Sequence, residues 1–156
     1  MSQRLDYRAA SADAFKAMLQ LEHQVHKSGL EPALLELVKS RASQLNGCAW
    51  CLDMHSKDAR ALGETEQRLY LLAAWHDAPC YSERERAALA WTEALTRLAN
   101  TQDVPDAVYL AARQHFDEKQ LVDLTLAIIA INGWNRLNVA FRTVVGDYVS
   151  PHPGNP

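Results

Sequence analysis

Apolar side chains recur every three or four positions along most of the chain, the spacing that places them on one face of an α-helix. No segment shows a convincing two-residue alternation typical of strands. The pattern therefore predicts an all-α fold of about six to seven helices, divided by Gly, Pro and Asn-Gly breaks. The predicted helices run from Ser11 to Ser28, Pro32 to Asn46, Cys48 to Leu62, Thr65 to Trp75, Ser82 to Leu98, Pro105 to Phe116 and Asp117 to Val145.

The length favours one domain. A chain of 156 residues can bury a full core without disulfide staples. Hydrophobic residues make up 48% and charged residues 22%, which is close to the average of globular proteins. We therefore expect residues 1–150 to form a single helical domain. Residues 151–156, which include three prolines and a glycine, should form a disordered or exposed tail.

The last predicted helix is apolar nearly all round, at Leu124, Ile128, Ile129 and Ile131. A helix that is apolar on every side is expected to be buried on every side. In so short a chain this predicts a homo-oligomer. The same helix carries polar side chains that need partners, and we expect those partners at a subunit interface or at the mouth of a site. These polar residues are Asn132, Asn135, Arg136, Asn138 and Arg142.

Charge and hydropathy limit the partners and the location. The net charge is −3, and Lys and Arg are scattered among Asp and Glu, so we expect no nucleic-acid partner. The N-terminus lacks the apolar core of a signal peptide, and no window approaches about 18 uninterrupted apolar residues. The sequence therefore predicts a cytoplasmic protein without a membrane span. In that compartment paired thiols seldom serve as permanent staples.

Two cysteines and a histidine follow the Asn46-Gly47 break, in the stretch N-G-C-A-W-C-L-D-M-H. Residues three and four apart share a helix face, so Cys48, Cys51 and His55 should form one stripe. Cys48 lies at the helix start, where free N–H groups and the helix dipole favour a thiolate. His55 can instead accept the proton of Cys51. The residues alone leave open which thiol attacks a substrate.

Glu36 is the candidate partner of that histidine. An imidazole accepts a proton more readily when a carboxylate holds its other ring nitrogen. The short break at Asn46-Gly47 makes the flanking helices an antiparallel hairpin. At ~1.5 Å per residue, Glu36 lies roughly 15 Å and His55 about 12 Å from the turn. We therefore expect the two side chains to stand at similar heights.

Three uses of the paired thiols are compatible with the residues. A C-x-x-C pair outside a clear zinc pattern favours redox chemistry over inert packing. A zinc site would need a fourth ligand, and the sequence holds no second C-x-x-C and no H-x3-H to provide it. Glu36 could supply that ligand. We expect neither a metal nor an organic cofactor. Cys80 has no partner at motif spacing and is expected to be incidental.

The stretch E-L-V-K-S-R-A-S-Q-L-N-G-C-A-W-C-L-D-M-H, residues 36–55, resembles the E-x11-C-x2-C-x3-H signature of the carboxymuconolactone decarboxylase superfamily, in its alkylhydroperoxidase AhpD-like branch. The resemblance centres on residues 36–75 and extends over roughly 30–145. It implies an AhpD-like helical domain that assembles as trimers or hexamers. It also implies a thiol peroxidase or disulfide reductase.

In that resemblance Cys51 attacks the peroxide, Cys48 resolves the intermediate, and His55 with Glu36 relays protons. The implied partners are a hydroperoxide substrate and a dithiol or protein reductant. Two alternatives stay open. One is a non-enzymatic redox-sensing oligomer that uses the same disulfide. The other is a cofactor-free decarboxylase of a lactone-like acid, although the decarboxylases of this superfamily usually lack the paired thiols.

Overall fold

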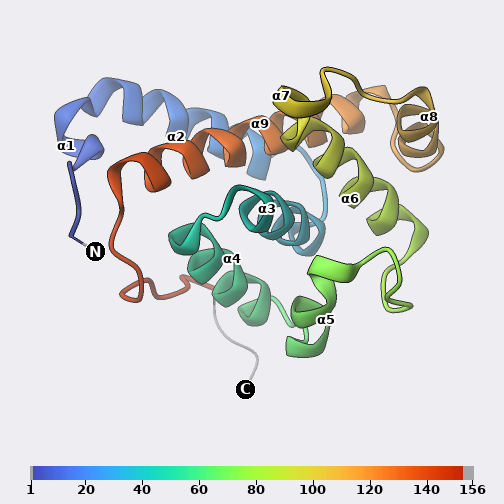
Figure 1. Ribbon diagram of the computed structural model, residues 1–156, viewed down its shortest axis with the longest axis horizontal. Helices are drawn as coiled ribbons and strands as arrows, with labels where there is room; N and C mark the ends of the chain where they lie inside the picture. The colour runs from blue at the N-terminus through green and yellow to red at the C-terminus, as the bar shows by residue number, and fades with distance from the viewer. Residues whose placement is uncertain (1, 153–156) are drawn as a thin grey trace.

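The computed structural model describes residues 2–152, and that part of the chain folds into α-helices joined by short connections (Figure 1). Helices α1 and α7 are single turns of four residues, so seven longer helices remain, in agreement with the predicted all-α fold. Most of the expected tail, residues 153–156, lies outside the described residues. The elements are α1 (Tyr7–Ala10), α2 (Ala12–His26), α3 (Pro32–Asn46), α4 (Ala49–Ala61), α5 (Glu66–Leu71), the 3₁₀ turn η1 (Leu72–Ala74), α6 (Glu83–Thr96), α7 (Leu98–Thr101), α8 (Asp106–His115) and α9 (Glu118–Phe141).

Several helix ends form where the capping signals predict them. Helix α3 begins at Pro32 and ends at Asn46, where Gly47 takes a left-handed conformation with φ 66°. Thr65 caps α5 through its side chain. Ser82 and Asp117 each form a reciprocal capping box at the starts of α6 and α9. Local chemistry therefore sets these boundaries.

Other boundaries differ from the predicted ones. Helix α9 ends at Phe141, four residues before Val145, because Arg142 adopts a left-handed conformation that stops the helix. The helix expected to continue through Leu98 is divided at Arg97 into α6 and α7. The single turn α1 was not predicted, since four residues are too short for a periodic pattern. The Asp6 side chain caps it.

Helix α3 is the centre of the molecule (Figure 1). It packs mainly on α4, α6 and α9. Residues 34–43 are all buried. Its Val38, Leu37 and Ala42 belong to three different apolar clusters, so one helix joins the whole core.

Charged side chains of α3 are buried with their partners. Lys39 is only 1% exposed and forms an ion pair with Glu22 of α2. Arg41 forms an ion pair with Glu93 of α6, at 2.7 Å between Arg41 Nη2 and Glu93 Oε1. Removing one partner of such a pair leaves an uncompensated buried charge, which costs about 3–5 kcal/mol. The buried pairs therefore specify how α2 and α6 dock on α3.

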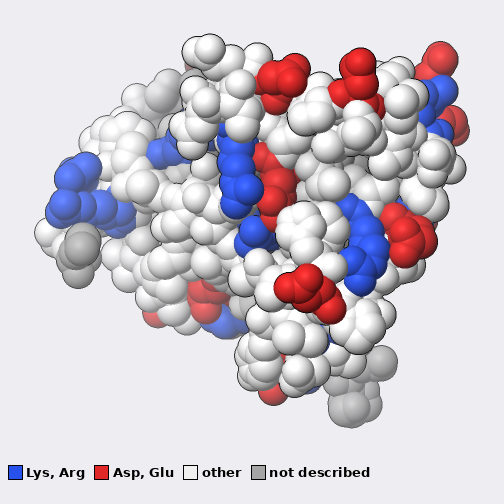
Figure 2. Space-filling view, turned by 45° about the vertical axis from the view of Figure 1, so that its right-hand side comes forward, with Lys and Arg blue, Asp and Glu red and all other residues white. Residues whose placement is uncertain are grey.

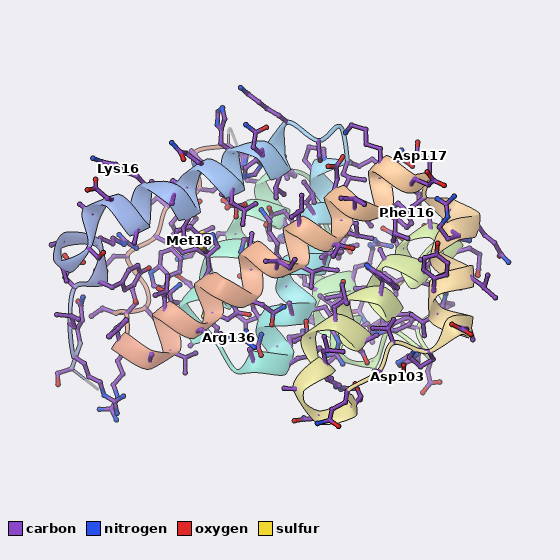
Figure 3. All side chains as sticks on the ribbon, turned by 90° about the horizontal axis from the view of Figure 1, so that it is seen from above. Lys16, Met18, Asp103, Phe116, Asp117 and Arg136 are labelled. Atoms are coloured by element: carbon purple, nitrogen blue, oxygen red, sulfur yellow. A yellow bond between two sulfur atoms is a disulfide. The ribbon has the colours of Figure 1, made fainter. Side chains whose placement is uncertain are left out.

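Helices α2 and α9 lie alongside each other over α3 (Figures 1 and 3). Met18 of α2 reaches α9 at Gly133, where an added Cβ would stand 2.8 Å from Met18 Cε. The missing side chain at Gly133 therefore allows the close approach. This arrangement brings the start of α2 toward the end of α9, next to the paired cysteines.

Charged side chains of both signs are interspersed on the face shown in Figure 2. Within residues 2–152, no helix is both long enough and apolar enough to cross a membrane.

One face of α9 differs from the prediction of burial on every side. Val122 is 59% and Ile129 is 53% exposed, and they lie seven residues apart on one helical stripe, with Val139 also exposed further along the helix. Most of the other apolar positions face the core, because a helix on the surface of one chain can turn only part of its circumference inward. Assembly into a homo-oligomer therefore stays a prediction.

We expect the oligomer to cover this stripe. Replacing Val122 and Ile129 together by Glu would place two charges on a face that assembly removes from water, so the mass should fall to that of a single chain. Size-exclusion chromatography with light scattering measures the mass. Tyr70→Glu on α5 is the control, because Tyr70 is 71% exposed and lies away from α9. A wild-type protein that is monomeric at all concentrations would contradict the expectation.

Candidate functional site

The turn between α3 and α4 positions the two cysteines. After Gly47 reverses the chain, the Cys48 backbone N–H donates to Ser43 O at 3.0 Å and Cys48 becomes the N-cap of α4. Cys48 and Cys51 form a disulfide with their Cα atoms 5.4 Å apart. Both residues are 1% exposed. The site is therefore a buried disulfide at the start of a helix.

Glu36 and His55 meet across the hairpin. His55 Nδ1 lies 2.8 Å from Glu36 Oε2, and both side chains are buried. The contact expected from the heights of the two residues is thus present. Glu36 holds one ring nitrogen, so the imidazole is oriented with its other nitrogen available for chemistry.

Asp58 and Tyr148 extend this pair, and sequence reasoning missed both. Asp58 lies on α4 three residues after His55, a spacing that could have indicated it. The Tyr148 hydroxyl lies 2.9 Å from both carboxylate oxygens of Asp58 and donates to them. Burial and this hydrogen bond raise the pKa of Tyr148 well above its usual range, so the phenol stays protonated. No sequence spacing indicates Tyr148, because it follows α9, ninety residues away from Asp58.

Glu36, His55 and Asp58 are also the group of described residues that could hold a metal ion, with ligand atoms within 4.8 Å of one another. This group contains neither cysteine, so it differs from the zinc alternative that the sequence allows. Its ligand atoms already have partners: Glu36 bonds His55, and Tyr148 donates to both oxygens of Asp58. The arrangement fits a hydrogen-bonded network of acid and base groups.

Asn138 of α9 contacts Cys51 directly. Its Nδ2 donates to Cys51 Sγ at 3.4 Å. Its Oδ1 accepts from the Tyr7 hydroxyl at 3.1 Å and from Thr143 Oγ1 at 2.7 Å. Because two hydroxyls donate to the oxygen, the amide must turn its N–H groups toward the sulfur. The expectation of a partner at the site is met for this residue.

Two other amides of α9 find partners inside the same chain instead of at a subunit interface. Asn135 Nδ2 donates to Ser43 Oγ at 3.0 Å. Asn46 Nδ2 donates to Asn135 Oδ1 at 2.8 Å and to Asn132 Oδ1 at 3.0 Å. These bonds fasten the end of α3 to α9, since an amide on a buried helix face needs a partner wherever one can reach it.

The two cysteines of the disulfide line different cavities. Cys51 and His55 line a largely apolar cavity of about 330 Å³, whereas Cys48 lines a cavity of about 800 Å³. Trp50 lines both cavities. The smaller cavity is lined by Tyr7, Arg8, Phe15, Leu19, Glu22, Trp50, Cys51, Met54, His55, Ile131, Trp134 and Tyr148.

The chain after α9 returns along α4 (Figure 1), and its Tyr148 lines this cavity. Lys57 of α4 donates to Tyr148 O at 2.9 Å and to Gly146 O at 3.4 Å. The Tyr148 ring stands edge-on to Trp50, with centroids 6.1 Å apart. The C-terminal segment therefore contributes one wall of the cavity.

Glu22 supplies a negative charge to the same cavity, and that charge is compensated. Burial raises its pKa, but hydrogen bonds from His26, Lys39 and Trp134, together with the charge of Lys39, lower it to about 2. Glu22 is therefore ionised at neutral pH and balanced by Lys39.

These features define a class of protein: an all-helical C-x-x-C protein whose disulfide stands beside a Glu–His pair on a helical hairpin. The sequence profile of the carboxymuconolactone decarboxylase family matches residues 12–94, more than half of the chain. The protein belongs to the carboxymuconolactone decarboxylase family. The matched range includes Glu36, Cys48, Cys51 and His55.

Relatives match over most of the chain. An uncharacterized Bacillus subtilis (strain 168) protein, YdfG, is 46% identical over 140 residues, which cover 90% of this chain and 95% of the relative. An uncharacterized Escherichia coli (strain K12) protein, YnjA, is 32% identical over 119 residues, covering 76% of this chain and 62% of the relative.

One solved structure is similar to this chain over almost its whole length. It is a protein of unknown function from Agrobacterium tumefaciens, provisionally named an antioxidant defence protein AhpD, and it is 44% identical with a TM-score of 0.90. The match covers 94% of this chain and 100% of that one. The fold is therefore AhpD-like, as the sequence resemblance predicts.

The low pKa of Glu22 predicts a pH-dependent stability. Because the folded-state pKa of about 2 lies below the ordinary value of 4.5, the carboxylate stabilises the fold above pH 4.5 and loses this effect as pH falls through 2. The free energy of unfolding should therefore drop by about 2 kcal/mol more between roughly pH 6 and roughly pH 3 in the wild type than in Glu22→Gln/Lys39→Met. Urea titrations across this range measure the difference, and parallel pH curves would contradict it.

Proposed function

We propose that the protein is a thiol-dependent peroxidase that reduces hydroperoxides through the Cys48–Cys51 pair. The observation that carries the proposal is that Cys51 and His55 line one cavity while His55 is held by Glu36 at 2.8 Å. A thiol beside an oriented imidazole can lose its proton and act as a nucleophile. Membership of the family and the similarity to an AhpD-named structure support a peroxidase-type role.

The proposed cycle starts from the reduced dithiol. The Cys51 thiolate attacks the terminal peroxide oxygen, forming an S–O bond as the O–O bond breaks, and the leaving alkoxide takes a proton from His55 to become an alcohol. Cys48 then attacks the sulfenic sulfur, and the proton lost by its thiol joins the leaving hydroxide, so water is released as the disulfide forms. An external dithiol reduces this disulfide and becomes oxidised in turn. The sum is a hydroperoxide and a dithiol giving an alcohol, water and a disulfide.

Two contacts favour Cys51 as the attacking thiol. Cys51 lines the same cavity as His55, whereas Cys48 lines the other one. Asn138 donates a hydrogen bond to Cys51 Sγ, and such a bond to a charged sulfur stabilises it more strongly than one to a neutral thiol. Cys48 receives only the Cys51 backbone N–H, at 3.4 Å, among the described residues. Cys48 is accordingly the resolving thiol.

The cysteine variants test the cycle. We expect Cys51→Ser to abolish hydroperoxide consumption with dithiothreitol as the reductant. Without added dithiol, pre-reduced Cys48→Ser should consume about one equivalent of peroxide and stop at a sulfenic acid, because no resolving thiol remains. A coupled peroxide assay measures turnover, and dimedone labelling read by mass spectrometry detects the sulfenic acid.

Cys80→Ser is the matched control, since Cys80 is free and lies away from the disulfide. Full turnover by Cys51→Ser would overturn the proposal. Disulfide formation without turnover would instead indicate a redox-sensing oligomer. Conversion of a lactone-like acid that needs His55 and Glu36 but neither thiol would indicate a decarboxylase.

The Asn138 contact predicts a rate effect. Asn138→Asp keeps an acceptor for Tyr7 and Thr143 but replaces the N–H donor by an oxygen that repels a thiolate. Hydrogen bonds to charged groups contribute about 1.5–3 kcal/mol, so we expect the rate of Cys51 oxidation to fall roughly 10- to 100-fold. Its pH profile should move to higher pH. Stopped-flow kinetics with excess hydroperoxide measure both.

Thr143→Val is the control for Asn138→Asp. It removes one bond that orients the amide but leaves the N–H donor and the Tyr7 contact in place. Its effect should be severalfold smaller. Equal rates for the wild type and Asn138→Asp would show that the amide has no part in activating Cys51.

A further inference from the structure

The cavity beside Cys51 combines apolar walls with one cation that has no carboxylate partner among the described residues. Most of its lining is aromatic or aliphatic. Besides the reacting thiol and two tyrosines, the ionisable side chains of the lining are Arg8, Glu22 and His55. Glu22 is paired with Lys39, and His55 is bonded to Glu36. Arg8 is the remaining charge, and among residues 2–152 its guanidinium makes no ion pair or hydrogen bond.

Aromatic rings hold Arg8 at the mouth of this cavity. Its Cζ lies 5.6 Å from the centroid of the Trp50 ring and 5.8 Å from each of the Tyr7 and Phe15 rings. Cation–π contacts of this kind use the faces of the rings and leave the in-plane N–H groups free to donate. The nearby carboxylate of Asp6 accepts from the backbone N–H groups of Arg8 and Ala9 instead.

A ligand that fills this cavity therefore meets two different ends. At one end, the Arg8 guanidinium lies over the ring of Trp50, the residue that precedes Cys51. At the other, Cys51 and His55 offer the reacting sulfur and the imidazole. A planar guanidinium binds a carboxylate through two parallel hydrogen bonds. The volume of about 330 Å³ lies at the small end of ligand pockets, so a long lipid chain would not fit inside.

We propose that Arg8 binds the carboxylate of a small apolar acid in this cavity, so that the preferred substrates are hydroperoxides of such acids. The inference rests on the proposed peroxidase function for its chemistry. The reaction is the cycle given above, which converts a hydroperoxy acid into a hydroxy acid and leaves the carboxylate unchanged. The paired charge of Glu22 and Lys39 does not oppose an anion, because the pair is neutral overall.

A matched pair of substrates tests the selectivity. The probes are cumene hydroperoxide and its para-carboxylate, which differ only in the charged group. For the wild type, we expect kcat/KM to be about three- to tenfold higher for the carboxylate, as a partly exposed charge-assisted contact allows. Arg8→Gln should bring this ratio to about one. Arg8→Lys, which keeps the charge but loses the fork, should give an intermediate ratio.

Lys16→Gln is the control for general electrostatic attraction. It removes one positive charge from the same helical region, but Lys16 points outward from α2 and pairs with Asp13 (Figure 3). It should keep the wild-type ratio. A wild-type ratio of one or below, or an Arg8→Gln protein that keeps the preference, would overturn the inference.

A binding measurement separates this inference from the proposed function. Calorimetric titration with para-isopropylbenzoate, and with the neutral para-isopropylbenzamide as its counterpart, needs no turnover. We expect the benzoate to bind the wild type more tightly than the amide does, and Arg8→Gln to remove that difference. If neither hydroperoxide is consumed but the benzoate binds through Arg8, the peroxidase proposal fails and the acid site stands. If both ligands bind equally, the acid site fails whatever the peroxidase activity.

Discussion

The structure depends on the burial of charged side chains along helix α3. Glu36, Lys39 and Arg41 are each less than 10% exposed, and each has a partner on a different helix. An unpaired charge in such a place would cost several kcal/mol, so α2, α4 and α6 must dock where they supply those partners. Apolar packing fills the core around α3, but these polar contacts specify the orientation of the helices. The pair of Glu36 and His55 belongs to the same set.

This central helix also explains why the candidate site is buried. The tight turn at Gly47 places the disulfide against α9, where Asn138 reaches Cys51. The segment after α9 then returns to α4 and places Tyr148 over Asp58 and beside the cavity. Segments near both ends of the chain, including α1, therefore contribute walls of the cavity, whereas the paired cysteines and His55 lie on the α3–α4 hairpin.

Much of the hairpin could be predicted from the residues. Pro32 and Gly47 mark the ends of α3, and the spacing of Cys48, Cys51 and His55 places them on one helix face. Similar distances from the turn predicted similar heights for Glu36 and His55, and their hydrogen bond is present. Asp58 could have been found by extending the same stripe. Asn138 was expected to find a partner at a subunit interface or a site mouth, but neither its contact with Cys51 nor the place of Tyr148 could be assigned, because no local rule relates residues about ninety positions apart.

The sequence by itself determined which segments are helical, where most of them begin and end, and which thiols and bases share a helix face. These properties are local, since caps, glycines and side-chain spacing act within a few residues. The tertiary structure alone decided that the polar side of α3 is buried, that Asn138 donates to Cys51, and that Arg8 stands at the cavity with no carboxylate partner among the described residues. Periodicity tells which face of a helix is apolar. It does not tell what covers the opposite face, because that depends on how separate helices pack together.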